Sequence, residues 1–235
     1  MNWKKSTFKK ELETLIHKKM GELNYLYNKK RLSFIKKRES SYSTILYQTT
    51  MNDCPKSSVG FHFSCSIHLD EITEILSQLN NEASITATLF GKMKTFTTQA
   101  SNDGSFYFDW NKDYLSKLEE LFKNVREFDA FCERIKSVSD LAPEKLSKIP
   151  FIRKLFPSGL EDNFGYCIPA VAALVHELNG DSIRALLMAE KDLQRMLKIS
   201  ERPKSVIPEE NLRTEQALLF SQNLVEFIRN RQAAL

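Results

Sequence analysis

Two histidines and two serines share one side of the segment from Phe61 to Leu69, where polar and apolar residues alternate without a break. This period of two is typical of a β-strand with one face on a core and the other toward solvent or a ligand. His62 and His68 are six residues apart, which is about 20 Å along a strand, so they cannot share one metal ion. Two separate polar positions, or two partly exposed histidines without a ligand, both fit the pattern. The candidate binding residues are Gln48, His62, Ser64, Ser66, His68 and Thr86.

The first 38 residues are strongly basic. They contain 12 Lys or Arg against three Glu, a charge of +9, so the other residues carry −5 of the overall +4. Such a segment faces phosphate, an anionic surface or an acidic protein, or is the solvated side of a helix. The expected basic patch consists of Lys5, Lys9, Lys10, Lys18 and Lys19. These lysines spread around the helix and do not form one stripe, which predicts only weak, non-specific nucleic-acid binding.

The other potentially reactive residues have no neighbours in the sequence that would form a catalytic site with them. The adjacent carboxylates at Glu119-Glu120, Glu161-Asp162 and Glu209-Glu210 would point about 100° apart on a helix, which favours solvation over a general acid and base. The four cysteines form no paired spacing, and we expect Cys65 and Cys132 to be reduced and buried. The sequence has no nucleophile elbow and no phosphate-binding glycine loop. It therefore predicts neither a cofactor nor a metal, and an enzyme is its third interpretation.

Hydrophobic periodicity predicts the elements that position these residues. Helices are expected over 3–23, from Asp70, and over 113–136, 169–178, 182–197 and 209–230. Strands are expected over 31–37, 42–49, 59–69, 83–90, 94–99 and 105–110. Short connections between strands imply antiparallel pairing. The fold class is α+β: a mostly antiparallel sheet of five to six strands, packed by an N-terminal helix and a long helix, followed by a C-terminal helical segment. We expect residues 1–137 to form the sheet domain and 138–235 the helical segment, packed as one unit.

The length and composition suit a folded protein outside the membrane. No run approaches the roughly 20 apolar residues of a membrane span. The basic start is not followed by the apolar segment that a signal peptide needs. We therefore expect a cytoplasmic protein of bacterial type without a membrane span, and its oligomeric state stays open.

The order of features resembles a bacterial family known as domain of unknown function 4304. The resemblance covers about residues 6–197. It rests on the basic first helix and on Ile45-Leu46-Tyr47-Gln48, Phe61-His62-Phe63, Leu69-Asp70-Glu71-Ile72, Phe106 to Trp110, Asp129-Ala130-Phe131 and Gly180-Asp181. It implies the α+β fold and no particular active site. Similar compact α+β proteins occur among the immunity proteins of bacterial toxin systems.

We therefore expect a protein-interaction module with a protein partner, of toxin-neutralising (immunity-like) or prophage-associated type. The alternative is a nucleic-acid-binding module that uses the basic segment 1–38. The two differ in salt response, because phosphate contacts weaken steeply with salt.

Overall fold

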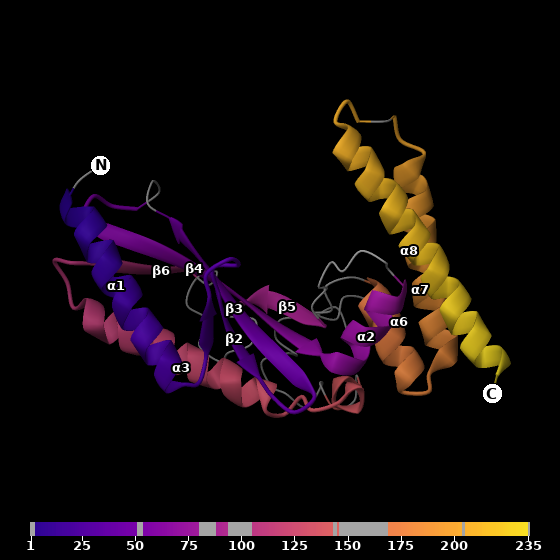
Figure 1. Ribbon diagram of the computed structural model, residues 1–235, viewed down its shortest axis with the longest axis horizontal. Coiled ribbons are helices and arrows are strands. Elements are labelled where there is room, and N and C mark those ends of the chain that lie inside the picture. The colour runs from indigo at the N-terminus through magenta and orange to yellow at the C-terminus, as the bar shows by residue number, and fades with distance from the viewer. Residues whose placement is uncertain are drawn as a thin grey trace.

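The computed structural model describes residues 3–50, 54–79, 88–93, 105–142, 145, 169–203 and 205–234. Its strands are β1 (Leu26–Asn28), β2 (Ser33–Lys37), β3 (Ser41–Thr50), β4 (Ser58–Leu69), β5 (Leu89–Lys92) and β6 (Ser105–Asp109). Its helices are α1 (Trp3–Glu22), α2 (Asp70–Leu79), α3 (Tyr114–Cys132), the 3-10 helix η3 (Val138–Leu141), α6 (Pro169–Leu178), α7 (Ser182–Ser200) and α8 (Pro208–Ala233). The fold is α+β, as predicted (Figure 1).

The six strands form one antiparallel sheet in the order β1-β2-β3-β4-β5, and β6 also pairs with β4. The 12-residue strand β4 is central because β3 pairs along one of its edges while β6 and β5 divide the other. On that second edge, β6 pairs with residues 58–62 and β5 with residues 64–67. This register determines which side chains from different strands share a face.

Helices α1 and α3 cover one face of the sheet (Figure 1). In β4, Phe61, Phe63 and Cys65 point to this face and are fully buried. The two helices also contact each other, since the rings of Phe8 and Tyr114 meet edge to face at 5.1 Å. Burial of each large apolar side chain contributes roughly 1.5–3 kcal/mol. The buried stripe of α1 consists of Phe8, Leu12, Ile16 and Met20.

The aromatic strand β6 lies against α3. Phe106 and Phe108 are buried, whereas Tyr107 points to the opposite face and is 48% exposed. Asp113 caps α3 by accepting a hydrogen bond from the backbone N–H of Ser116 at 3.1 Å. The buried stripe of α3 includes Leu118, Leu121, Val125, Phe128 and Cys132.

The C-terminal helices begin with α6, whose residues 170–177 are all buried. The helix ends at Leu178, Gly180 follows it with a φ of +81°, and the N–H of Asp181 donates a hydrogen bond to the carbonyl of His176 at 2.9 Å. This arrangement is a left-handed C-cap. Helix α6 contacts α2 and η3, and the α7–α8 hairpin projects beyond the sheet (Figure 1). The boundary between residues 137 and 138 stays a prediction.

Three strand predictions differ from the structure. The edge strand β1 was not foreseen, and its Leu26 is 76% exposed, because an edge strand needs little apolar patterning. The strand expected over 31–37 begins only at Ser33, since Leu32 adopts a turn conformation with φ of +47°. Of the strand expected over 83–90, Leu89 and Phe90 belong to β5. Residues 83–87 and the strand expected over 94–99 lie outside the described residues.

Candidate functional site: the open face of the sheet

The face of the sheet opposite α1 and α3 is the candidate site, and we call it the open face. The register places side chains from four strands on it in facing rows. Gln48 faces His62, Ser64 faces Lys92, and Phe90 faces Ser66. The open face consists of Tyr42, Thr44, Leu46 and Gln48 of β3, His62, Ser64, Ser66 and His68 of β4, Phe90 and Lys92 of β5, and Ser105 and Tyr107 of β6.

One end of the open face is a closed polar cluster. The Nε2 atom of His68 lies 3.0 Å from the Ser66 hydroxyl and 3.3 Å from the Thr44 hydroxyl, and the two hydroxyls also contact each other. The Tyr42 ring stacks on the His68 imidazole at 4.2 Å between centroids. Burial raises the pKa of Tyr42, although the nearby Arg31 guanidinium opposes this effect.

The expectation of partly exposed strand histidines is wrong for His68, which is buried, as is Ser66. The reason is the neighbouring strand. Tyr42 lies directly opposite His68 in the ladder and covers its ring. Sequence alternation identifies the face of each residue but not what covers it.

His62 belongs to a second, separate cluster. Its Nδ1 atom lies 3.1 Å from the Ser105 hydroxyl, and Gln48 faces it from β3. His62 is half-buried and Gln48 is exposed. The six-residue separation from His68 on one strand keeps the two imidazoles in different clusters. Ser64 lies between them and is half-buried. The last predicted binding residue, Thr86, lies outside the described residues.

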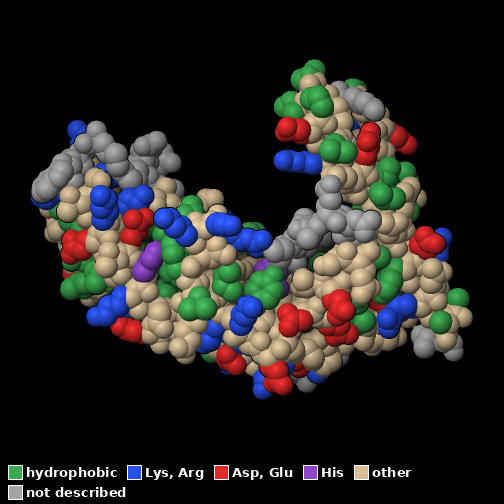
Figure 2. Space-filling model, in the orientation of Figure 1, with side chains coloured by type: hydrophobic (Ala, Val, Ile, Leu, Met, Phe, Trp, Pro, Cys, Tyr) green, Lys and Arg blue, Asp and Glu red, His purple; other side chains and the backbone are tan. Residues whose placement is uncertain are grey.

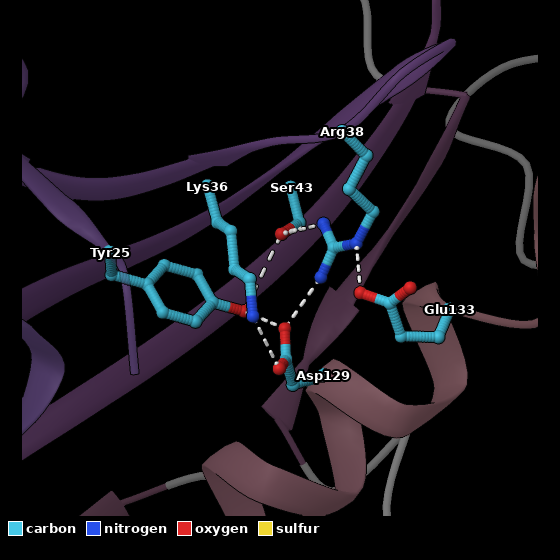
Figure 3. A network of polar contacts seen from close by, with 6 residues as sticks. All are labelled: Tyr25, Lys36, Arg38, Ser43, Asp129 and Glu133. Atoms are coloured by element: carbon cyan, nitrogen blue, oxygen red, sulfur yellow. Dashed lines mark hydrogen bonds and ion pairs between the residues drawn. The ribbon is translucent and has the colours of Figure 1, made fainter. Parts of the chain in front are cut away.

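A charged network that the sequence did not suggest lies on the covered face, at the end of α3 (Figure 3). Asp129 accepts hydrogen bonds from Lys36 at 2.7 Å, from Arg38 at 2.5 Å and from the Tyr25 hydroxyl at 3.2 Å. Arg38 also contacts Glu133 at 2.8 Å and the Ser43 hydroxyl at 2.8 Å. The charges of the two cations and the two carboxylates cancel, so the network keeps no net charge that could attract a ligand. Its ion pairs join the end of α3 to β2.

The thiol next to this network is a poor nucleophile. Burial raises the pKa of Cys132 to about 12, partly opposed by Arg38. Burial also raises the pKa of Cys65 well above its usual range. Since the thiolate is the reactive form, neither cysteine is activated. Both are buried and neither forms a disulfide, as predicted.

The predicted basic patch on α1 uses part of its charge within the protein. Lys9 pairs with Glu13 at 3.6 Å, and Lys19 pairs with Glu119 at 2.6 Å. Lys10 and Lys18 are exposed, whereas Lys5 is half-buried. These pairs lower the number of cations that α1 offers to phosphate.

His17 lies among these lysines on α1 and is packed against the sheet. Its ring contacts Tyr27 at 4.2 Å and Phe34 at 5.1 Å between centroids, and its Nε2 lies 3.2 Å from the Tyr47 hydroxyl. Partial burial lowers the pKa of His17, against the opposing effect of Glu13.

The part of the chain that the structure describes contains no group of three or more His, Cys, Asp or Glu side chains suited to a metal ion. A pocket of about 200 Å³ lies where α7 turns into α8, lined in part by Arg202, Glu210 and Thr214.

Among the described residues, no helix is both long enough and apolar enough to cross a bilayer. Comparisons with protein-family models, curated proteins and solved structures match nothing to this chain.

Proposed function

We propose that this chain is a protein-interaction module that binds its partner on the open face of the sheet. The observation that carries the proposal is the contrast between the two faces. Helices α1 and α3 cover one face, whereas the other exposes Leu46 by 36%, Phe90 by 53% and Tyr107 by 48%. Exposed aromatic and aliphatic side chains surrounded by polar groups are typical of the anchors of protein interfaces.

The polar groups of the open face support binding over catalysis. The hydroxyls of Ser66 and Thr44 contact each other and the His68 imidazole, and His68 is covered by Tyr42. Hydrogen bonds of this kind hold side chains in one arrangement, and a preorganised surface loses less entropy on binding. A toxin-neutralising protein is one form of such a module, and compact α+β proteins of this type occur among the immunity proteins of bacterial toxin systems.

The experiment that tests this function is capture from a nuclease-treated lysate of the source organism, quantified by mass spectrometry. The bait proteins are the wild type, Phe90→Asp and Tyr107→Asp. The matched control is Ile183→Asp, because Ile183 is 85% exposed but lies on α7. We expect both sheet variants to lose at least about tenfold of the captured partner, the usual effect of disrupting an interface anchor, and the control to keep it.

Circular dichroism of each variant verifies the fold, so that loss of capture reports on the surface. Retention of the partner by both sheet variants contradicts the proposal. Equal loss in the Ile183→Asp control contradicts it as well, because the partner would then depend on the α7–α8 hairpin.

A further inference from the structure

Three cations border the open face. Lys37 faces Tyr42 in the ladder, and Lys92 faces Ser64 from the other side of β4. The guanidinium of Arg31 lies close enough to Tyr42 to influence its hydroxyl electrostatically. All three cations are exposed. Figure 2 shows Lys and Arg side chains gathered over the strands, beside the hollow between the sheet and the α7–α8 hairpin.

These cations differ from three basic residues of the covered face in their ionic contacts. Lys19, Lys36 and Arg38 each pair with a carboxylate within 2.9 Å. Within the described ranges, Arg31, Lys37 and Lys92 form no ion pair with a carboxylate. Exposed positive charge without a carboxylate beside it produces a local field that attracts anions.

Among the described residues, the carboxylates of the open face lie at its ends. Asp70 lies beyond His68, next to Tyr42, and Asp109 faces Ser58 at the other end of β4. The rows between them, from His62 to Ser66, contain no carboxylate among the described residues. Among the described residues of these rows, the cation is Lys92, and Phe90 lies two positions before it on β5. Lys37 lies at the Tyr42 end of the face, as Asp70 does.

We propose that the protein partner presents an acidic segment to the open face, with its carboxylates at Arg31, Lys37 and Lys92 and its apolar side chains against Phe90 and Tyr107. This inference rests on the proposed function and specifies the chemistry of the partner. Complementary charge at the border of an interface raises the association rate and makes it sensitive to salt.

The spacing of the aromatic residues favours a polypeptide over a single-stranded nucleic acid. Phe90 faces Ser66 and Tyr107 faces Gly60, six residues apart on β4, which is about 20 Å. Sheets that bind single strands stack successive bases on neighbouring aromatic rings. Two rings this far apart instead suit separate anchors of a protein interface.

The test measures fluorescence anisotropy of a labelled peptide of alternating Glu and Gly at low and at physiological salt. The probes for comparison are the matching Gln and Gly peptide and a labelled oligo-dT. We expect the triple variant Arg31→Gln, Lys37→Gln, Lys92→Gln to bind the Glu peptide about tenfold more weakly, since each exposed pair contributes a few-fold. The charge-matched control is Lys10→Gln, Lys18→Gln, Lys123→Gln on α1 and α3, expected to change affinity by less than about twofold.

Equal weakening in the control variant overturns the inference, because net charge alone would then explain binding. Absence of binding to the Glu peptide also overturns it, as does tighter binding of oligo-dT that the triple variant loses. The capture experiment distinguishes failure of this inference from failure of the proposed function. If the triple variant keeps the partner while Phe90→Asp loses it, the acidic segment is wrong and the proposed function stands.

Discussion

The imidazole of His68 is stacked on the phenol ring of Tyr42, with centroids 4.2 Å apart and planes only 5° from parallel. The two residues face each other across the β3–β4 ladder. The stack orients Nε2 of His68 toward the hydroxyls of Ser66 and Thr44. One cross-strand pair thereby orders a polar cluster at one end of the open face.

Removal of this imidazole is expected to destabilise the protein more than removal of the second histidine on the same strand. His68→Ala removes the aromatic contact, which contributes about 0.5–1.5 kcal/mol. It also removes a hydrogen-bond partner of the buried hydroxyls, which costs about 1–3 kcal/mol. We expect His68→Ala to lower the free energy of unfolding by roughly 2–3 kcal/mol. His62→Ala, at a half-buried position, is expected to cost about 1 kcal/mol or less. Urea unfolding followed by circular dichroism measures both, and equal losses would disprove the distinction.

A second prediction concerns the network that joins α3 to the sheet. Asp129→Ala leaves Lys36 and Arg38 without their shared carboxylate, and both are more than four-fifths buried. Removal of one partner of a buried ion pair costs about 3–5 kcal/mol. At this partly exposed site we expect the free energy of unfolding to fall by roughly 2–4 kcal/mol. Glu133→Ala is the matched control, because Glu133 binds the same Arg38 but is 57% exposed, and it should cost less than about 1 kcal/mol. A loss as small for Asp129→Ala as for Glu133→Ala would mean that the network is not a structural clamp.

Sequence periodicity predicted the sheet well and its polar clusters only in part. The alternation around His62, Ser64, Ser66 and His68 assigned all four to one face, because side-chain direction in a strand depends on position parity alone. Burial of His68 depends on Tyr42, which is 26 positions away, and no local pattern encodes that pairing. The Asp129 network likewise joins Tyr25, Lys36 and Arg38 across about a hundred residues. In the sequence, its two cations were indistinguishable from the rest of the basic segment.

The burial of one tyrosine and two cysteines predicts that the free energy of unfolding declines at alkaline pH. Burial raises the pKa values of Tyr25, Cys65 and Cys132 in the folded protein. The folded state therefore keeps these protons when the unfolded chain releases them, above about pH 8.5 for cysteine and about 10 for tyrosine. Their contribution is fully present below those values and is lost as the pH rises. Each group lowers the free energy of unfolding by up to about 1.4 kcal/mol per pH unit in this range.

Urea unfolding at pH 8, 9 and 10 measures this decline. Cys65→Ala removes one of the three groups and is expected to make the dependence on pH shallower. Alkylation of the native protein at pH 8 should label Cys65 and Cys132 slowly for the same reason. A free energy of unfolding that stays constant from pH 8 to 10 would show that these groups ionise in the folded state.

The last prediction concerns nucleic acid and the helix α1. A site that follows a phosphate backbone needs several cations on one side and exposed aromatic rings for stacking. On α1, Lys9 and Lys19 are paired with Glu13 and Glu119, and Phe8 is buried. We therefore expect weak, sequence-independent binding that disappears near physiological salt, with a slope that corresponds to only a few phosphate contacts. Titration of labelled single- and double-stranded oligonucleotides at two salt concentrations measures this binding.

Glu119→Gln provides a directed test, because it frees Lys19 and should strengthen binding slightly at low salt. Tight binding that survives the higher salt and is lost in Lys10→Gln, Lys18→Gln would instead assign α1 to nucleic acid, since both lysines are exposed and form no ion pair with a described residue.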